Sequence, residues 1–68
     1  MTHLVIGSGL LGRAIINALL HRGVPVRVLD IQPFDYPETH NLTGDIRDRD
    51  RVQAACDGVQ TVYHTASL

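Results

Sequence analysis

The strongest constraint on the fold is a glycine-rich turn that joins a short apolar run to a helical pattern. Leu4-Val5-Ile6 lead directly into Gly7-Ser8-Gly9-Leu10-Leu11-Gly12, and Asp30 closes the next apolar run, 18 residues past the last glycine. Glycines at this spacing allow a sharp exit from a strand, close approach of the backbone to a ligand, and close packing of the helix on the strand. The pattern predicts a β-α-β unit whose first turn binds the pyrophosphate of a dinucleotide.

A helix from about Leu10 to Arg22 is predicted after this turn. Gly23 and Pro25 form its stop signal, because glycine accepts the left-handed conformation and proline cannot continue a helix. The run 26–30 is rich in β-formers, so residues 2–30 make one β-α-β unit. The helix is expected to lie mostly hidden on the sheet, because its apolar residues recur at helical spacing: Leu11, Ala14, Ile15, Ile16, Ala18, Leu19 and Leu20.

The second half of the chain repeats the alternation of strand and helix. Two prolines favour a loop over residues 31–40, and a short strand is expected around residues 41–43. Asp48 is placed to cap a helix that ends at Gly58 and presents one small apolar face, formed by Val52, Ala55 and Cys56. The β-branched and aromatic run 59–66 predicts a fourth strand, so that residues 41–66 form a β-α-β segment.

Four strands and two helices in this order predict an α/β fold, the N-terminal half of a doubly wound Rossmann sheet with strand order 3-2-1-4. Residues 1–68 are then a partial dinucleotide-binding domain, because 68 residues are too few for a complete dehydrogenase. In such a sheet the nucleotide lies at the carboxyl ends of the strands, where the chain reverses its direction of growth.

Composition excludes several other classes of function. The formal charge is -1, so no basic surface is expected to recruit nucleic acid or a membrane, and no apolar run is long enough to span one. One cysteine and four scattered histidines form no zinc pattern, so no metal is expected, and Cys56 is interpreted as a packed apolar residue. A single cysteine and no apparent leader make the cytoplasm the default location.

Asp30 is expected to accept hydrogen bonds from the adenosine ribose hydroxyls, and its charge would repel a 2′-phosphate. NAD is therefore favoured over NADP, since Ile31 and Gln32 supply no arginine that would reverse the preference. Arg13 is within reach of a phosphate in principle, but a solvated position in the first helical turn is the more ordinary interpretation.

These motifs, with the segments Gly44-Asp45-Ile46-Arg47-Asp48 and Val62-Tyr63-His64-Thr65-Ala66-Ser67, resemble the N-terminal part of the extended short-chain dehydrogenase/reductases. The most similar branch comprises the 3β-hydroxysteroid and sterol-4α-carboxylate 3-dehydrogenases. The resemblance implies that Asp45 and the backbone of Ile46 contact the adenine edge, and that Thr65 and Ala66 line the cofactor past the pyrophosphate. From the residues alone, Asp45 is a turn residue and Thr65 a strand end.

The chain departs from that family pattern in two ways. Extended members usually carry a Thr-Gly-x-x-Gly-x-x-Gly loop, whereas this chain has the shorter form, with Ile6 where threonine is expected. Their catalytic tyrosine is followed four residues later by a lysine, and this chain contains no lysine. Tyr36 and Tyr63 therefore cannot form that pair, and no catalytic residue is expected here.

The sequence favours the NAD-binding N-terminal segment of a short-chain oxidoreductase that acts on the CH–OH or carbonyl group of a sterol-like or sugar-like substrate. The segment itself is expected to be inactive because it is truncated. One alternative is an FAD-binding segment of a flavin oxidoreductase. Another is a non-catalytic nucleotide-binding or interaction fragment that associates with itself through an uncovered sheet edge. The candidate cofactor-binding residues are Gly7, Ser8, Gly9, Leu10, Leu11, Gly12, Asp30, Ile31, Asp45, Ile46, Thr65 and Ala66.

Overall fold

A computed structural model describes residues 2–32 and 38–65 of this chain. Within them, strands and helices alternate along the chain except between the second and third strands. Their bounds are β1 (Thr2–Ile6), α1 (Leu10–His21), β2 (Val26–Asp30), β3 (Thr39–Thr43), α2 (Arg49–Ala55) and β4 (Val59–His64).

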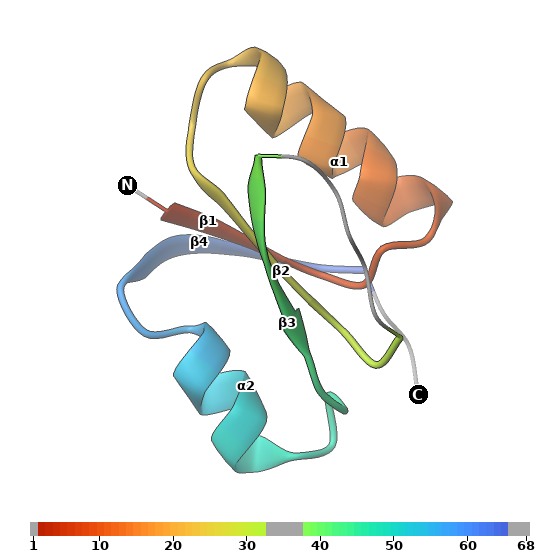
Figure 1. Ribbon diagram of the computed structural model, residues 1–68, viewed down its shortest axis with the longest axis vertical. Coiled ribbons are helices and arrows are strands. Elements are labelled where there is room, and N and C mark those ends of the chain that lie inside the picture. The colour runs from red at the N-terminus through yellow and green to blue at the C-terminus, as the bar shows by residue number, and fades with distance from the viewer. Residues whose placement is uncertain (1, 33–37, 66–68) are drawn as a thin grey trace.

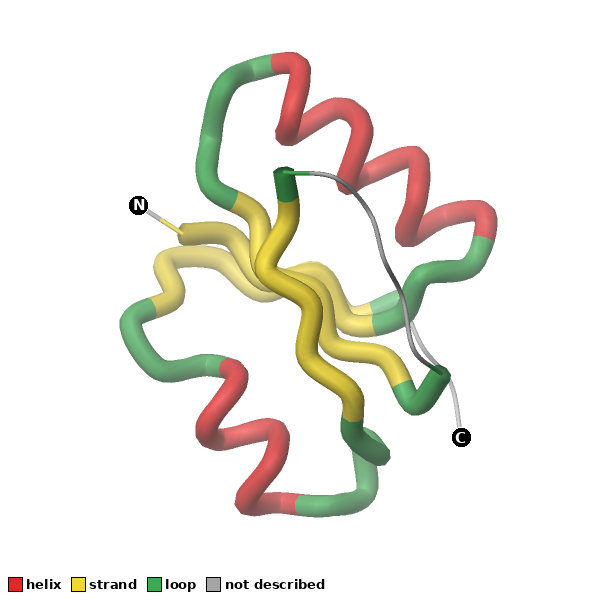
Figure 2. The backbone as a smooth tube through the Cα atoms, in the orientation of Figure 1, coloured by secondary structure: helices red, strands yellow, loops and turns green. Residues whose placement is uncertain are grey.

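The four strands form one parallel sheet of order β3-β2-β1-β4, which confirms the predicted fold class and strand order. Helices α1 and α2 lie on opposite faces of the sheet (Figure 1), so that it is covered from both sides (Figure 2). All four strands run in the same direction, and their carboxyl ends therefore meet at one edge of the sheet.

Two small apolar cores hold the helices to the sheet, because successive residues of a strand point to opposite faces. Val5 lies in the core under α1, whereas Leu4 and Ile6 lie in the core under α2. The α1 core is completed by Ile16, Leu19, Val26 and Val28, and the α2 core by Leu29 and Ala55. A continuous apolar run such as that of β1 is what a strand buried on both faces requires.

The prediction of which face of α1 is buried is partly wrong. Its buried residues are Gly12, Ile16 and Leu19, whereas Leu11 is 64% exposed. Ala14 and Ala18 are also exposed, while Ile15 and Leu20 are half-buried beside the core. The cause is the close approach of Gly12 to β1, described below, which turns the helix so that the positions four and seven residues after Gly12 face the sheet.

Helix α2 ends at Ala55, before the predicted end at Gly58, and three other predicted boundaries also differ from the structure. β3 begins at Thr39, inside the predicted loop 31–40, because its full length pairs with β2, from Val26 opposite Thr39 to Asp30 opposite Thr43. α1 ends at His21, with Arg22 as its C-cap, and Gly23 has the expected positive φ of 74°. β4 ends at His64, and Ala66 lies outside the described residues.

Helix α2 is short and depends on contacts at both ends. At its start, the Asp48 side chain accepts hydrogen bonds from the backbone N–H groups of Asp50 and Arg51, as predicted for an N-cap. At its end, Nη1 of Arg27 in β2 donates to the carbonyl oxygen atoms of Ala55 and Asp57, at 2.7 and 2.8 Å. The predicted apolar face is confirmed, since Ala55 is buried and both Val52 and Cys56 pack against the same core.

Candidate functional site

The carboxyl ends of all four strands are joined by backbone hydrogen bonds at one edge of the sheet. The N–H of Gly7, after β1, donates to the carbonyl of Leu29 in β2, at 2.9 Å. The N–H of Gly44, after β3, donates to the carbonyl of Asp30, also at 2.9 Å. The N–H of Thr65, after β4, donates to the carbonyl of Ile6. The predicted site segments therefore lie side by side, although they are far apart in the sequence.

The first turn owes its shape to two of its glycines. Gly7 has a φ of 99°, a conformation that side chains strongly disfavour. A Cβ atom on Gly12 would lie 2.0 Å from the carbonyl oxygen of Gly7, which real structures do not allow. The turn can fold back beneath α1 only because position 12 has no side chain, as the motif predicted.

The N-terminus of α1 is open toward the same edge of the sheet. Gly9 is the N-cap, no side chain caps the helix, and its first turn contains no acidic residue. The first intrahelical bond joins the N–H of Arg13 to the carbonyl of Gly9, so the preceding N–H groups of the first turn are not used within the helix. Such N–H groups at the positive end of a helix dipole bind phosphate.

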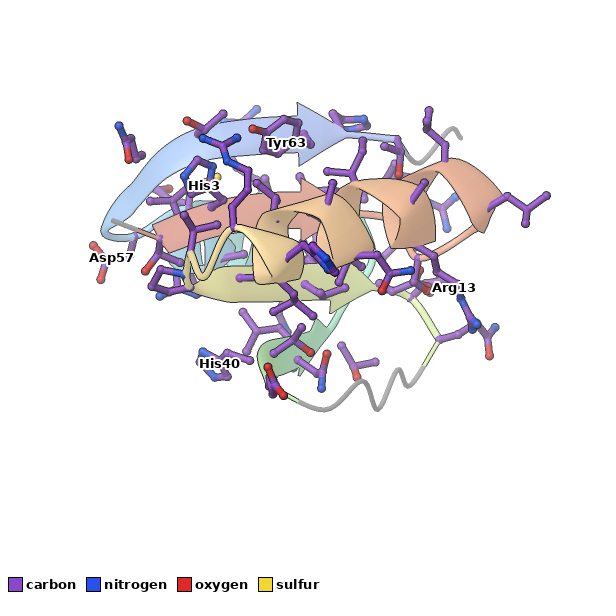
Figure 3. The ribbon with its side chains drawn as sticks, turned by 90° about the horizontal axis from the view of Figure 1, so that it is seen from above. His3, Arg13, His40, Asp57 and Tyr63 are labelled. Atoms are coloured by element: carbon purple, nitrogen blue, oxygen red, sulfur yellow. The ribbon has the colours of Figure 1, made fainter. Side chains whose placement is uncertain are left out.

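Arg13 lies beside this turn, at the carboxyl end of the sheet, whereas Asp57 lies at the opposite end (Figure 3). The side chain of Arg13 is exposed, and its Nε donates to the carbonyl of Ser8 at 3.1 Å. The guanidinium of Arg13 is therefore hydrogen-bonded to the backbone of the glycine turn.

Asp30 lies at the end of β2 and faces the glycine turn. Its Oδ2 atom accepts two hydrogen bonds of 2.7 Å, one from the backbone N–H and one from the hydroxyl of Ser8. Its Oδ1 atom accepts a third, of 2.9 Å, from the N–H of Gln32. Partial burial would raise the pKa of Asp30, but the hydrogen bonds from Ser8, Gln32 and Ile31 outweigh it and leave the pKa below its ordinary value of 3.8. A charged acceptor is thus held where the ribose is expected.

Asp45 and Ile46 follow β3, and their side chains have different surroundings: Asp45 pairs with Arg47, whereas Ile46 packs against the α2 core. Arg47 donates to Asp45 through its backbone N–H and its guanidinium, with a shortest distance of 2.6 Å, and these bonds lower the pKa of Asp45 to about 2. The side chain of Asp45 is 30% exposed and that of Arg47 is 70% exposed, so this ion pair contributes little to stability. Ile46 is half-buried and packs its side chain against the α2 core.

Thr65 adopts a position that the sequence did not predict. Its hydroxyl donates to the carbonyl oxygen of Ile6 at 2.8 Å and approaches that of Gly7 at 3.2 Å. The hydroxyl oxygen also lies 3.1 Å from where a Cβ of Gly12 would be. Thr65 therefore supports the glycine turn from below, a contact between residues 59 positions apart for which the local sequence contains no signal.

Three of the apolar members of the predicted set are exposed at the same edge. Leu10 is 93% exposed, Leu11 64% and Ile31 58%. A bound molecule at this edge would be able to cover these three side chains. Among the described residues, the other exposed large hydrophobic side chain is that of Val62 in β4, which is 44% exposed.

Residues 2–32 and 38–65 contain neither a cluster of metal ligands nor a membrane-spanning helix. No three His, Cys, Asp or Glu side chains in these ranges come together as metal ligands. No helix in the same ranges is long and apolar enough to cross a membrane.

Known proteins with similar sequences include a sterol dehydrogenase and a steroid dehydrogenase. The human sterol-4-alpha-carboxylate 3-dehydrogenase (decarboxylating) is 45% identical over 62 residues, which cover 90% of this chain and 17% of that protein. The 3 beta-hydroxysteroid dehydrogenase/Delta 5-->4-isomerase of Mycobacterium tuberculosis is 40% identical over 65 residues, which cover 91% of this chain and 18% of that protein.

A solved structure with the same arrangement is a short-chain dehydrogenase/reductase superfamily protein from Agrobacterium tumefaciens with bound NAD. It superposes with a TM-score of 0.87 at 32% identity, covering all of this chain and 21% of that one. This chain therefore spans about a fifth of the length of the proteins that it resembles.

These similarities confirm the resemblance drawn from the glycine turn, Asp30 and the Gly44-Asp45 segment, and they favour a dehydrogenase over the flavin alternative. The 3-beta hydroxysteroid dehydrogenase/isomerase family matches the sequence over residues 4–68, nearly its whole length. The chain belongs to this family.

Proposed function

We propose that this chain is the NAD-binding segment of an oxidoreductase. The observation that carries the proposal is the meeting of two groups at the carboxyl edge of the sheet, the open N-terminus of α1 and the Asp30 carboxylate. The first offers N–H donors to a pyrophosphate, and the second offers a charged acceptor to a ribose. A relative with the same fold holds NAD, which supports the choice of dinucleotide.

The described residues fit such a dinucleotide. A Cβ at Gly9 would have no neighbour within 4 Å, so the outer side of the turn is open to a phosphate group. The N–H groups after Gly9 would hold the pyrophosphate, and Asp30 would hold the adenosine ribose. Asp45 and Ile46 would border the adenine, as the family resemblance implies. NAD would supply a hydride acceptor at its nicotinamide.

The substrate is proposed to carry a CH–OH or carbonyl group on a sterol-like or sugar-like molecule. The names of the two sequence relatives above support the sterol-like choice. Hydride transfer itself needs an acid–base group such as a tyrosine with a nearby lysine. The chain has no lysine, so we assign binding and not catalysis to it.

Two further proposals concern its surroundings. The β4 edge pairs only with β1 among the described strands, which favours association of copies through this edge. Cys56 is a free thiol packed beside the α2 core, which is consistent with our assignment to a reducing compartment, the cytoplasm.

Calorimetric titration of the 68-residue chain with NAD, NADP and FAD tests the proposed function. We expect NAD to bind more tightly than NADP, and FAD not to bind. Asp30→Ala should weaken NAD binding by about tenfold, since a hydrogen bond to a charged group is lost, and should leave NADP no more disfavoured than NAD. Asp57→Asn, at the far end of the sheet, is the control. Tighter binding of NADP than NAD by the unmodified chain would contradict the role of Asp30.

A further inference from the structure

Ser8 contacts the Asp30 carboxylate twice, although the glycine pattern does not specify which residue stands between its first two glycines. Its backbone N–H and its hydroxyl both donate to the same oxygen, Oδ2, at 2.7 Å. Any residue at position 8 would supply the backbone bond, but only a hydroxyl side chain supplies the second. The side chain of Ser8 is therefore a specific addition to the glycine pattern.

Ser8 is itself held in place by two attachments of the turn, one to β2 and one to α1. The preceding residue, Gly7, has a φ of 99° and donates its N–H to Leu29 in β2. The carbonyl of Ser8 accepts from Nε of Arg13, at 3.1 Å. The Ser8 hydroxyl is thus carried by a turn that is fixed to β2 and α1, and the carboxylate it contacts is fixed with it.

The two oxygen atoms of Asp30 are consequently not equivalent. A carboxylate offers about four acceptor positions, two on each oxygen. Ser8 donates both of its bonds to Oδ2, whereas the backbone N–H of Gln32 donates to Oδ1, and a backbone bond from Ile31 also holds the carboxylate. Oδ1 receives no bond from Ser8, and it is the oxygen that the turn leaves to a ligand approaching the end of β2.

We propose that Ser8 is a specificity-determining residue for the dinucleotide, whose hydroxyl holds the Asp30 carboxylate so that Oδ1 accepts from the ribose and opposes a 2′-phosphate. The inference rests on the proposed function and goes beyond it, because it assigns the selectivity for NAD to a pair of residues. A carboxylate that can turn toward water loses both effects: it meets the ribose hydroxyl less often, and it repels the phosphate from a greater distance.

The test is the ratio of the dissociation constants for NADP and NAD, measured by calorimetry on the 68-residue chain. Ser8→Ala should weaken NAD binding by about tenfold with little change for NADP, so the ratio should fall by about tenfold. Ser8→Thr keeps the hydroxyl and should retain the ratio within about threefold. Ser8→Cys replaces the hydroxyl with a weak donor and should behave like Ser8→Ala. Thr2→Val, at the other end of β1, is the control for removal of a hydroxyl.

The pH dependence of NAD binding supplies a readout that loosened packing would not change. The ionised carboxylate of Asp30 contributes fully to NAD binding above its ordinary pKa of 3.8. This contribution to binding is lost as the pH falls through the lowered pKa of Asp30. Removing the Ser8 hydroxyl removes one cause of the lowered pKa, so the acid limit of binding should move to higher pH in Ser8→Ala and Ser8→Cys, but not in Ser8→Thr.

Two negative results have different meanings. Equal weakening of NAD and NADP by Ser8→Ala, with an unchanged acid limit, would overturn the inference and leave the proposed function intact. Failure of the unmodified chain to bind either dinucleotide would overturn the proposed function itself, and the assignment of Ser8 with it.

Discussion

At the scale of single residues, Gly12 and Gly9 differ in what a methyl group would meet. A Cβ on Gly12 would lie 2.0 Å from the Gly7 carbonyl oxygen and 3.1 Å from the Thr65 hydroxyl oxygen, whereas a Cβ on Gly9 would meet nothing within 4 Å. The φ of Gly9 is -71°, which alanine also adopts. Gly12 is therefore required for the fold of the turn, whereas Gly9 is not, and we propose that Gly9 faces the ligand.

This difference predicts opposite outcomes for two alanine variants. Gly12→Ala should lower the free energy of unfolding by about 2 kcal/mol or more, because the turn must move away from the helix. Gly9→Ala should lower it by less than about 1 kcal/mol, and should weaken NAD binding by filling the space that the pyrophosphate needs. Urea denaturation and calorimetry measure the two effects. A Gly12→Ala variant as stable as the unmodified chain would contradict the assignment.

At the scale of elements, the end of β4 supports the turn that follows β1. The hydroxyl and N–H of Thr65 both donate to the Ile6 carbonyl, so the last residue described in the chain stabilises the first turn. The residue that follows β4 thus stabilises the glycine turn through hydrogen bonds, a role that needs no contact with a ligand. Lining of the cofactor by Thr65 remains a prediction, and it is compatible with this support.

Replacing Thr65 tests the support. Thr65→Val conserves the shape of the side chain and removes its donor, and it should lower the free energy of unfolding by about 1 kcal/mol. Amide hydrogen exchange should also become faster at the N–H of Gly7, which bonds to Leu29. Thr65→Ser retains the donor and should keep the slow exchange. Unchanged exchange in Thr65→Val would show that the hydroxyl does not hold the turn.

At the scale of the whole molecule, one edge of the sheet ends at β4. Val62 on this strand is 44% exposed. It lies on the same face of the sheet as α2, because it pairs with Leu4, whose side chain is in the α2 core. An apolar residue on an edge strand favours pairing with another chain. His3 and Tyr63, on the α1 face, are instead stacked on each other, with ring centroids 6.0 Å apart (Figure 3).

The association of copies should therefore respond to charge at this edge. We expect the apparent mass in analytical ultracentrifugation to rise with concentration for the unmodified chain, and Val62→Lys to reduce that rise, because a lysine on an edge strand opposes pairing. Gln53→Lys adds the same charge on the exposed surface of α2 and is the matched control. An equal reduction in both variants would indicate a general effect of charge.

Much of the site was predictable because it depends on local chemistry. The glycine spacing, the position of Asp30 after an apolar run and the Asp48 cap are properties of short segments, in which backbone freedom, alternation and capping act over a few residues. The start of β3 at Thr39 was not predictable from these signals, because its first two residues are strand only through their pairing with β2.

The sequence by itself determined the order of the strands and helices, the turn that joins β1 to α1, and the acid that faces it. Only the tertiary structure decided which face of α1 is buried, because the contact between Gly12 and Gly7 sets the rotation of the helix. It also decided that Ser8 holds Asp30 and that Thr65 holds the turn. These contacts join residues 22 and 59 positions apart, and such distances close only when parallel strands bring their carboxyl ends to one edge of the sheet.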